Sequence, residues 1–204
     1  MFYVFPLQGI SRRETCSKKN GFSLIEILAV VAIIIVFSSV VTANFSEARG
    51  QLALKRAAHQ MIQDIRRAQE MAMSSAEFKE SENCSPPLPV AKGYGIFINL
   101  ESGPDPGDNK NYILYADKNG DENYSSADCI IKTISIEEKG IVIKEIQNTS
   151  GQNVTINFKP PNPNTSIKWL NEIKNEVEIV LALEANQLKT KTVVVNRAGM
   201  LQTR

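Results

Sequence analysis

Two groups of polar side chains have a composition and spacing that could bind ions. The first group places oxygen-bearing side chains at alternate positions: Asp117, Asn119, Asp121, Asn123, Ser125 and Asp128. Counted from Asp117, they take positions 1, 3, 5, 7, 9 and 12, the spacing with which one loop wraps a calcium ion. However, Gly120 stands at position four instead of six, and position twelve is Asp instead of Glu. Two interpretations stay open: a calcium site, held mainly by Asp117, Asn119, Asp121 and Asp128, or a polar hairpin loop in which Asn119-Gly120 forms the turn.

The second group is basic and lies at the C-terminal end of the chain. Residues 185–204 contain no acid, and their cations are Lys189, Lys191, Arg197 and Arg204. A basic strand can neutralise the phosphates of DNA, with a steep dependence on salt. Lysines on an exposed strand also keep a sheet edge from pairing with other chains. DNA binding and a solubilised edge strand are therefore both compatible with this segment.

No group of residues predicts catalysis. The sequence has no phosphate-binding loop, no Gly-x-Ser-x-Gly and no metalloprotease helix, and its single histidine, His59, has no nucleophile or carboxylate pair beside it. A net charge of +1 over 204 residues argues against a general nucleic-acid coat. We therefore expect a protein that is not an enzyme and needs no resident cofactor other than the possible calcium ion.

One apolar stretch dominates the N-terminal part of the chain. Residues 22–45 include a single charge, Glu26, and about 20 apolar residues suffice for a helix to cross a bilayer. Residues 1–21 carry four basic residues against one acid, so the positive-inside rule predicts a cytoplasmic N-terminus and an exported remainder. A cleaved secretory signal would have a shorter apolar core. A plain membrane anchor gives no reason for Glu26, since an ionisable group in a membrane helix is costly.

The residues around Glu26 resemble a known processing signal. Lys18-Lys19-Asn20-Gly21-Phe22-Ser23-Leu24-Ile25-Glu26, followed by the apolar run, resembles the class III leader of type IV prepilins and type II secretion pseudopilins. The resemblance implies that a prepilin peptidase cuts between Gly21 and Phe22 and that Phe22 is N-methylated. It also implies a single-pass protein of the bacterial inner membrane whose partners are other pilin or pseudopilin subunits.

The same resemblance gives Glu26 a role in assembly. In that family the glutamate is thought to pair with the N-terminal amine of a neighbouring subunit. Opposite charges attract strongly in a bundle of low dielectric, and a register slip would leave one of them unpaired. The alternative is that Glu26 only reaches toward the lipid headgroups.

The apolar pattern predicts the elements that position these groups. Leu54, Ala58, Met61, Ile65, Ala68 and Ala72 recur at helical spacing, so we expect one helix over residues 22–79, with Gly50 as its weakest point. Runs at 93–100, 111–116, 129–136, 140–146, 153–158, 176–183 and 188–196 are typical of strands. Loops are expected at 101–110 and 159–166. The predicted fold class is α+β, a long N-terminal helix on a β-rich antiparallel head at residues 80–204.

The head sequence is similar to GspH/FimT-like minor pilins and pseudopilins. The similarity lies in residues 66–72, 112–121 and 197–199. Removal of residues 1–21 takes Cys16 away, and export of the remaining pair favours a disulfide between Cys84 and Cys129 over two unpaired thiols. The predicted function is a structural minor pilin or pseudopilin of a type IV pilus or type II secretion filament. The alternative is a minor pilin that binds DNA through its basic C-terminal strand.

Overall fold

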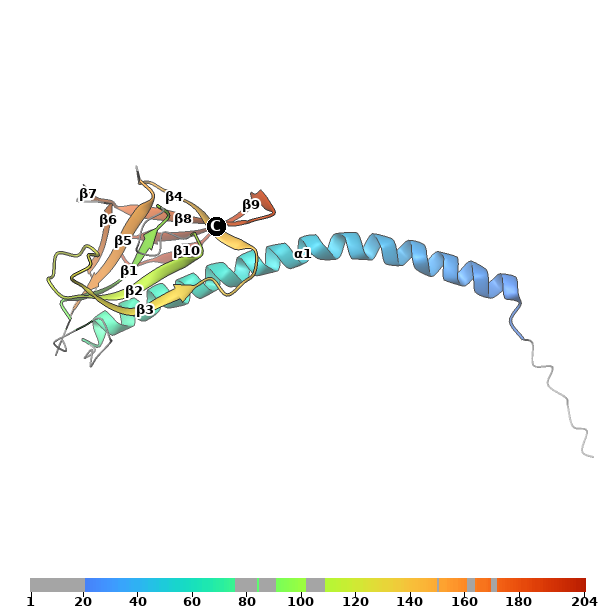
Figure 1. Ribbon diagram of the computed structural model, residues 1–204, viewed down its shortest axis with the longest axis horizontal. Helices are drawn as coiled ribbons and strands as arrows, with labels where there is room; N and C mark the ends of the chain where they lie inside the picture. The colour runs from blue at the N-terminus through green and yellow to red at the C-terminus, as the bar shows by residue number, and fades with distance from the viewer. Residues whose placement is uncertain are drawn as a thin grey trace, which may run out of the picture. The chain divides into compact units, whose positions relative to one another are not determined.

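A computed structural model describes residues 21–75, 84, 91–101, 109–149, 151–160, 164–169 and 172–204. Within its helix, the side chains of residues 40–44 and 46 lie outside this description. The leader at residues 1–20, with Cys16, also lies outside it. The chain divides into two compact units, Met1–Asn44 and Phe45–Arg204, which are described separately below (Figure 1).

A single helix, α1 (Leu24–Met73), begins in the first unit and ends in the second. At its start, the carbonyl of Ser23 accepts hydrogen bonds from the N–H groups of Glu26 and Ile27. At its end, the N–H of Ser74 bonds to the carbonyl of Glu70, and Ser75 turns the chain with a φ of 45°. The predicted helix is therefore too long at its C-terminal end, because α1 stops at Met73 and a two-residue turn follows. Residues 76–79 lie outside the described residues.

Gly50 does not interrupt the helix, in contrast to the expectation that it would be a weak point. It lies inside α1, and a Cβ built on it would come within 2.9 Å of Leu183 Cδ1. The missing side chain thus lets the helix approach the end of strand β8 (Glu176–Leu183) closely.

The head of the second unit contains two antiparallel sheets (Figure 1). The first has the strand order β3-β2-β1-β5-β6-β7 and the second has the order β10-β9-β8-β4. The bounds not yet given are β1 (Gly93–Asn99), β2 (Asn111–Asp117), β3 (Cys129–Ser135), β4 (Ile141–Gln147), β5 (Asn153–Lys159), β6 (Asn164–Trp169), β7 (Glu172–Ile173), β9 (Asn186–Asn196) and β10 (Leu201–Thr203). A helix packed on antiparallel sheets confirms the predicted α+β class.

Three strands were not expected from the sequence. β6 begins at Asn164, inside the segment predicted as a loop, and its partner β5 supplies the apolar residues that a short polar strand lacks. β7 and β10 are too short to leave a pattern. β10 pairs with Val193, Val194 and Val195, so this part of β9 is internal, whereas Lys189 and Lys191 lie on the part of β9 before this pairing.

The helix contributes a narrow stripe to the core of the head. The predicted stripe residues are all buried: Leu54, Ala58, Met61, Ile65, Ala68 and Ala72. Alanine at three of these positions lets the backbone of α1 come close to the strands. The strands contribute larger side chains to the same core, among them Tyr94, Ile96, Leu114, Ile156, Phe158 and Leu181.

Among the residues whose side chains are described, no helix combines the length and the apolarity that a membrane crossing requires. Part of the predicted span, residues 40–44, belongs to the side chains that are not described.

Candidate functional site

The residues predicted for processing and assembly lie together at the start of α1. Gly21, Phe22 and Ser23 precede the helix and are exposed, so the bond between Gly21 and Phe22 stands in a non-helical segment. Glu26 is the one acidic residue in the first turn, where the N-terminal end of a helix favours a carboxylate. Ser23 and Glu26 also have the Ser-x-x-Glu spacing of a helix-capping pair, a signal that the sequence reading did not use.

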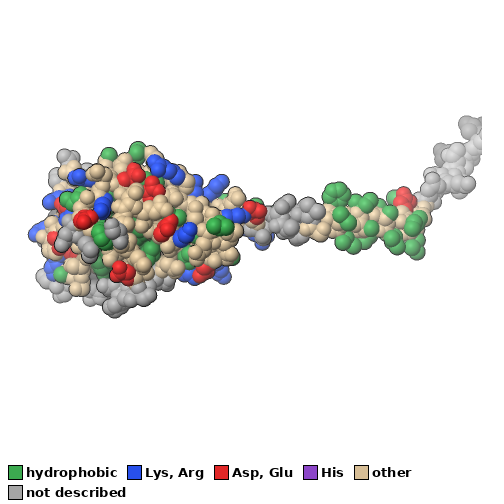
Figure 2. Space-filling view, turned by 90° about the horizontal axis from the view of Figure 1, so that it is seen from above, with side chains coloured by type: hydrophobic (Ala, Val, Ile, Leu, Met, Phe, Trp, Pro, Cys, Tyr) green, Lys and Arg blue, Asp and Glu red, His purple; other side chains and the backbone are tan. Residues whose placement is uncertain are grey.

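The first unit exposes apolar side chains along its helix. The large ones are Phe22, Leu24, Ile25, Ile27, Leu28, Val30, Val31, Ile33, Ile34, Ile35, Val36 and Phe37. Figure 2 shows hydrophobic side chains covering most of this helical stretch. A surface of this kind is unfavourable in water, so it needs an apolar environment from lipid or from other helices.

The polar loop with calcium-like spacing connects β2 to β3 at residues 118–128. Backbone N–H groups of the loop bond to two carboxylates, those of Asp117 at the end of β2 and of Asp128 at the end of the loop. Buried Asp117 accepts the N–H of Gly120 at 2.6 Å through Oδ1 and the N–H of Glu122 at 3.0 Å through Oδ2. Asp128 accepts the N–H groups of Lys118 at 3.0 Å and Ser125 at 2.8 Å. The loop is therefore a hairpin connection closed from within by two carboxylates.

Burial raises the pKa of Asp117, although the N–H groups of Gly120 and Glu122 oppose this effect. The side-chain amide of Asn119 donates a hydrogen bond to the carboxylate of Asp121 and accepts one from its backbone N–H. Asp121 also accepts the N–H of Asn123 at 2.8 Å. In the described part of the chain, no three His, Cys, Asp or Glu side chains are grouped so that they could hold a metal ion. Calcium binding stays a prediction from the sequence.

The four basic residues near the C-terminus are spread along the sheet. Lys189 forms an ion pair with Glu47 of α1 and lowers the pKa of that carboxyl group. Arg204 forms another, in which its Nη1 lies 3.3 Å from Oε1 of Glu178 on β8. Lys191 and Arg197 have no ion-pair partner among the described residues. Lys189 in β9 and Arg197 directly after it are eight residue steps apart, roughly 25 Å along an extended chain. The structure does not gather these cations into one patch.

Cys84 and Cys129 form a disulfide bond, and both are buried. Their Cα atoms are 5.1 Å apart. The bond fixes the segment that follows α1 to the first residue of β3.

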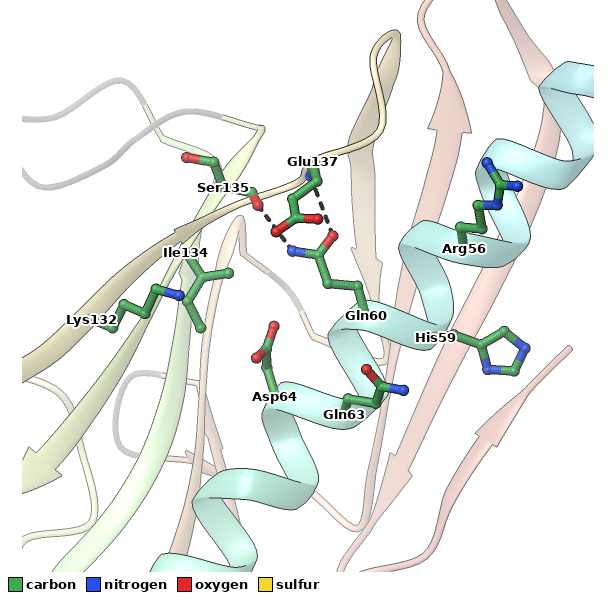
Figure 3. A pocket seen from close by; sticks show the side chains of 9 residues that line it. All are labelled: Arg56, His59, Gln60, Gln63, Asp64, Lys132, Ile134, Ser135 and Glu137. Carbon is green, nitrogen blue, oxygen red and sulfur yellow. Dashed lines mark hydrogen bonds between the residues drawn. The ribbon is translucent and has the colours of Figure 1, made fainter.

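A groove of about 580 Å³ runs between α1 and β3 (Figure 3). Gln60 spans it, donating to the carbonyl of Ser135 at 3.0 Å and accepting the N–H of Glu137 at 3.3 Å. The Gln60 amide thus pairs with the last residue of β3 and with the chain after it, as the backbone of a neighbouring strand would. His59 and Asp64 also line the groove, and Asp64 accepts a hydrogen bond from the hydroxyl of Tyr112. Gln60 and Asp64 had no signal in the sequence.

One family of known proteins matches the N-terminal segment, and one solved structure is similar over most of the chain. The family of the prokaryotic N-terminal methylation motif matches residues 16–42, which include Gly21, Phe22 and Glu26. The crystal structure of the type IV minor pilin FimU from Pseudomonas aeruginosa strain PAO1 has a TM-score of 0.46 and 12% identity, over 78% of this chain and 92% of that chain. No curated protein sequence matches the chain. The match supports the resemblance of residues 18–26 to a processing signal, because residues 16–42 of this chain carry a prokaryotic N-terminal methylation motif.

Proposed function

We propose that the chain is a structural, non-enzymatic subunit of a type IV pilus or type II secretion filament, in the role of a minor pilin or pseudopilin. The observation that carries the proposal is a helix with one charge, Glu26, in its first turn and exposed apolar side chains along the described residues that follow. The methylation motif over the same residues supports it.

Processing is the first step of the proposed function. A prepilin peptidase removes residues 1–21 at the cytoplasmic face of the inner membrane, and the new amine of Phe22 is methylated. The exposed, non-helical Gly21 and Phe22 support this step, because a peptidase needs an extended backbone at the bond that it cuts. The helix then holds the subunit in the inner membrane with its head exported.

Assembly is the second step. The amine of Phe22 in one subunit pairs with Glu26 of the next as the helices pack side by side. In a bundle of apolar helices an unpaired carboxylate is costly, so this ion pair selects one axial register. Burial of the apolar side chains from Leu24 to Phe37 supplies the cohesion of the bundle.

A comparison of variants at position 26 tests the assembly role. Glu26→Ala and Glu26→Gln remove the charge, whereas Glu26→Asp keeps it, and all three leave the apolar face unchanged. We expect equal amounts of each processed protein in the membrane, but far less of the Ala and Gln variants in sheared filaments. Incorporation of the Ala variant at the level of the parent would overturn the role of Glu26.

DNA binding stays a prediction from the sequence, and no contact described above favours it. An electrophoretic shift assay with the purified chain at low and moderate salt tests it. A salt-sensitive shift that is lost in Lys191→Gln would support it, and the absence of a shift at low salt would remove it.

A further inference from the structure

We infer that the head carries a second contact with the membrane, a bulge of β9 that rests on anionic phospholipid. The inference rests on the proposed function, because it requires that the apolar helix is inserted in a bilayer. The bulge consists of Gln187, Leu188 and Lys189, and it is called the β9 bulge below.

The pairing of β8 with β9 shows that this segment leaves the sheet. Leu183 is paired with Asn186, but the preceding Ala182 is paired with Thr190, so three residues of β9 have no partner on β8. Bulges of this kind redirect side chains. Here the result is that Leu188 is 92% exposed, the highest value among the exposed large hydrophobic residues of the head.

Lysines surround this exposed leucine. Lys55 of α1 lines a hollow of about 310 Å³ together with Leu188, Lys189 and Lys191. Lys144 of β4 joins them, because its Nζ donates to the carbonyl of Gln187 at 3.4 Å. Two acids close to these lysines have other or local partners: Glu47 pairs with Lys189, and Glu184 pairs with Lys110. In the described part of the chain, no acid pairs with Lys55, Lys144 or Lys191, which leaves a local positive charge.

The β9 bulge contacts the first residues of α1 that belong to the second unit. Lys189 contacts Glu47, which follows Phe45 by two residues, or roughly 3 Å along a helix axis. Phe45 ends the predicted membrane span, so the contact with Glu47 puts Lys189 beside the residues of α1 that emerge at the lipid headgroups when the span is inserted. Figure 1 shows the β9 end of the head beside α1, and Figure 2 shows Lys and Arg side chains at that end.

The chemistry of the bulge fits a lipid surface better than a nucleic acid. Surface-binding segments combine an apolar side chain that enters the headgroup region with lysines that attract anionic lipid. A phosphate backbone would use the lysines but gives no reason for an exposed leucine. One leucine and a few lysines bind weakly alone, but the helix holds them at the surface and raises their effective concentration. The contact would fix the orientation of the head before assembly.

An environment-sensitive fluorophore at position 188 tests this contact in the full chain. The label is placed by Leu188→Cys in a Cys16→Ser background, since Cys84 and Cys129 are bonded to each other. The matched control is Ile173→Cys, an exposed apolar residue on β7, which Figure 1 shows at the other end of the head. Both proteins are reconstituted into phosphatidylcholine vesicles with and without phosphatidylglycerol.

With phosphatidylglycerol, we expect the emission at position 188 to shift to the blue and to rise by roughly twofold or more, and that at 173 to stay constant. High salt and Lys191→Gln should reduce the response, and Lys132→Gln on β3 should not. Equal spectra at positions 188 and 173 in a protein that floats with the vesicles would overturn the inference alone, because flotation shows that the helix is still inserted. A protein that does not float with vesicles would overturn the proposed function as well. A response that requires added duplex DNA would mean that the bulge binds DNA, and a response that grows with the protein-to-lipid ratio would mean that it binds a second subunit. Either result would overturn the inference.

Discussion

Asp64 of α1 accepts a hydrogen bond of 2.6 Å from the hydroxyl of Tyr112 on β2. Tyr112 is 1% exposed, so its hydroxyl has no access to bulk water and depends on this partner. The bond ties the helix to the six-stranded sheet beside the groove that Gln60 spans. It is thus one of the polar contacts that hold the head on its helix.

Removal of this hydrogen bond should destabilise the head. Tyr112→Phe leaves the ring in place and deletes the donor, so we expect a loss of about 1–2 kcal/mol in the free energy of unfolding. Asp64→Ala should cost a similar amount, since it leaves a buried hydroxyl unpaired. Denaturant unfolding of the parent, both single variants and the double variant measures the coupling. Additive losses would show that the two side chains do not interact.

The same tyrosine predicts a response to alkaline pH. Burial, and after it the hydrogen bond and charge of Asp64, raise the pKa of Tyr112 well above its usual value near 10. The phenol therefore ionises first in the unfolded chain. Its contribution to stability is complete below pH 10 and falls above it, by about 1.4 kcal/mol per pH unit.

Comparison with Tyr112→Phe isolates this contribution from the titration of lysines and other tyrosines. The cost of the substitution, measured by denaturant unfolding at several pH values, should be largest below pH 10 and should shrink above it. A cost that stays constant up to pH 11.5 would contradict the assignment.

Gly95 on β1 has no room for a side chain. A Cβ there would lie 2.5 Å from the backbone oxygen of Ile156 and 2.7 Å from Cε1 of Tyr115. Because β1 is hydrogen-bonded on both sides, to β2 and β5, it cannot move away, and Gly95→Ala should cost about 1–3 kcal/mol.

Gly50→Ala is the matched control for this substitution. Its Cβ would meet only the end of the Leu183 side chain, and the better helix propensity of alanine offsets about 1 kcal/mol. Thermal unfolding should therefore show a clear loss for Gly95→Ala and a small change for Gly50→Ala. The reverse order would mean that β1 adapts and the contact of α1 with β8 does not.

The disulfide should contribute a large part of the stability of the head. Cys84 and Cys129 are separated by 45 residues, and a bridge over such a distance typically adds about 2–4 kcal/mol. The Cys84→Ala/Cys129→Ala double variant should lose this amount in denaturant unfolding, and reduction of the parent should have the same effect. Alkylation of both thiols in the unreduced, exported protein would contradict the bond.

The periodic parts of the fold could be predicted from the sequence. The stripe from Leu54 to Ala72 repeats every three or four residues, and β5 and β8 alternate, so their burial follows from local pattern. β6 could not be predicted, because its stability comes from pairing with β5 and its own sequence is polar. The continuous helix at Gly50 could not be predicted for a related reason, because the residue that packs against it, Leu183, is far away in the chain.

The candidate site divides in the same way. The segment from Gly21 to Glu26 is a contiguous motif, so the sequence was enough to find it. The hydrogen bonds of Gln60 and Asp64 join residues more than 45 positions apart, and no local pattern indicates them. The β9 bulge could not be predicted, because it depends on a register shift against β8.

The most direct test of the proposed function is the identity of the first residue of the mature protein. The full chain is expressed in a host that has a prepilin peptidase, purified from the membrane fraction, and examined by intact mass and by sequencing of its N-terminal peptide. We expect a chain that begins with N-methylated Phe22, and an uncut chain after substitution of Gly21 by a bulky residue. A membrane protein that still carries residues 1–21, or an unmethylated chain cut at another bond, would contradict it.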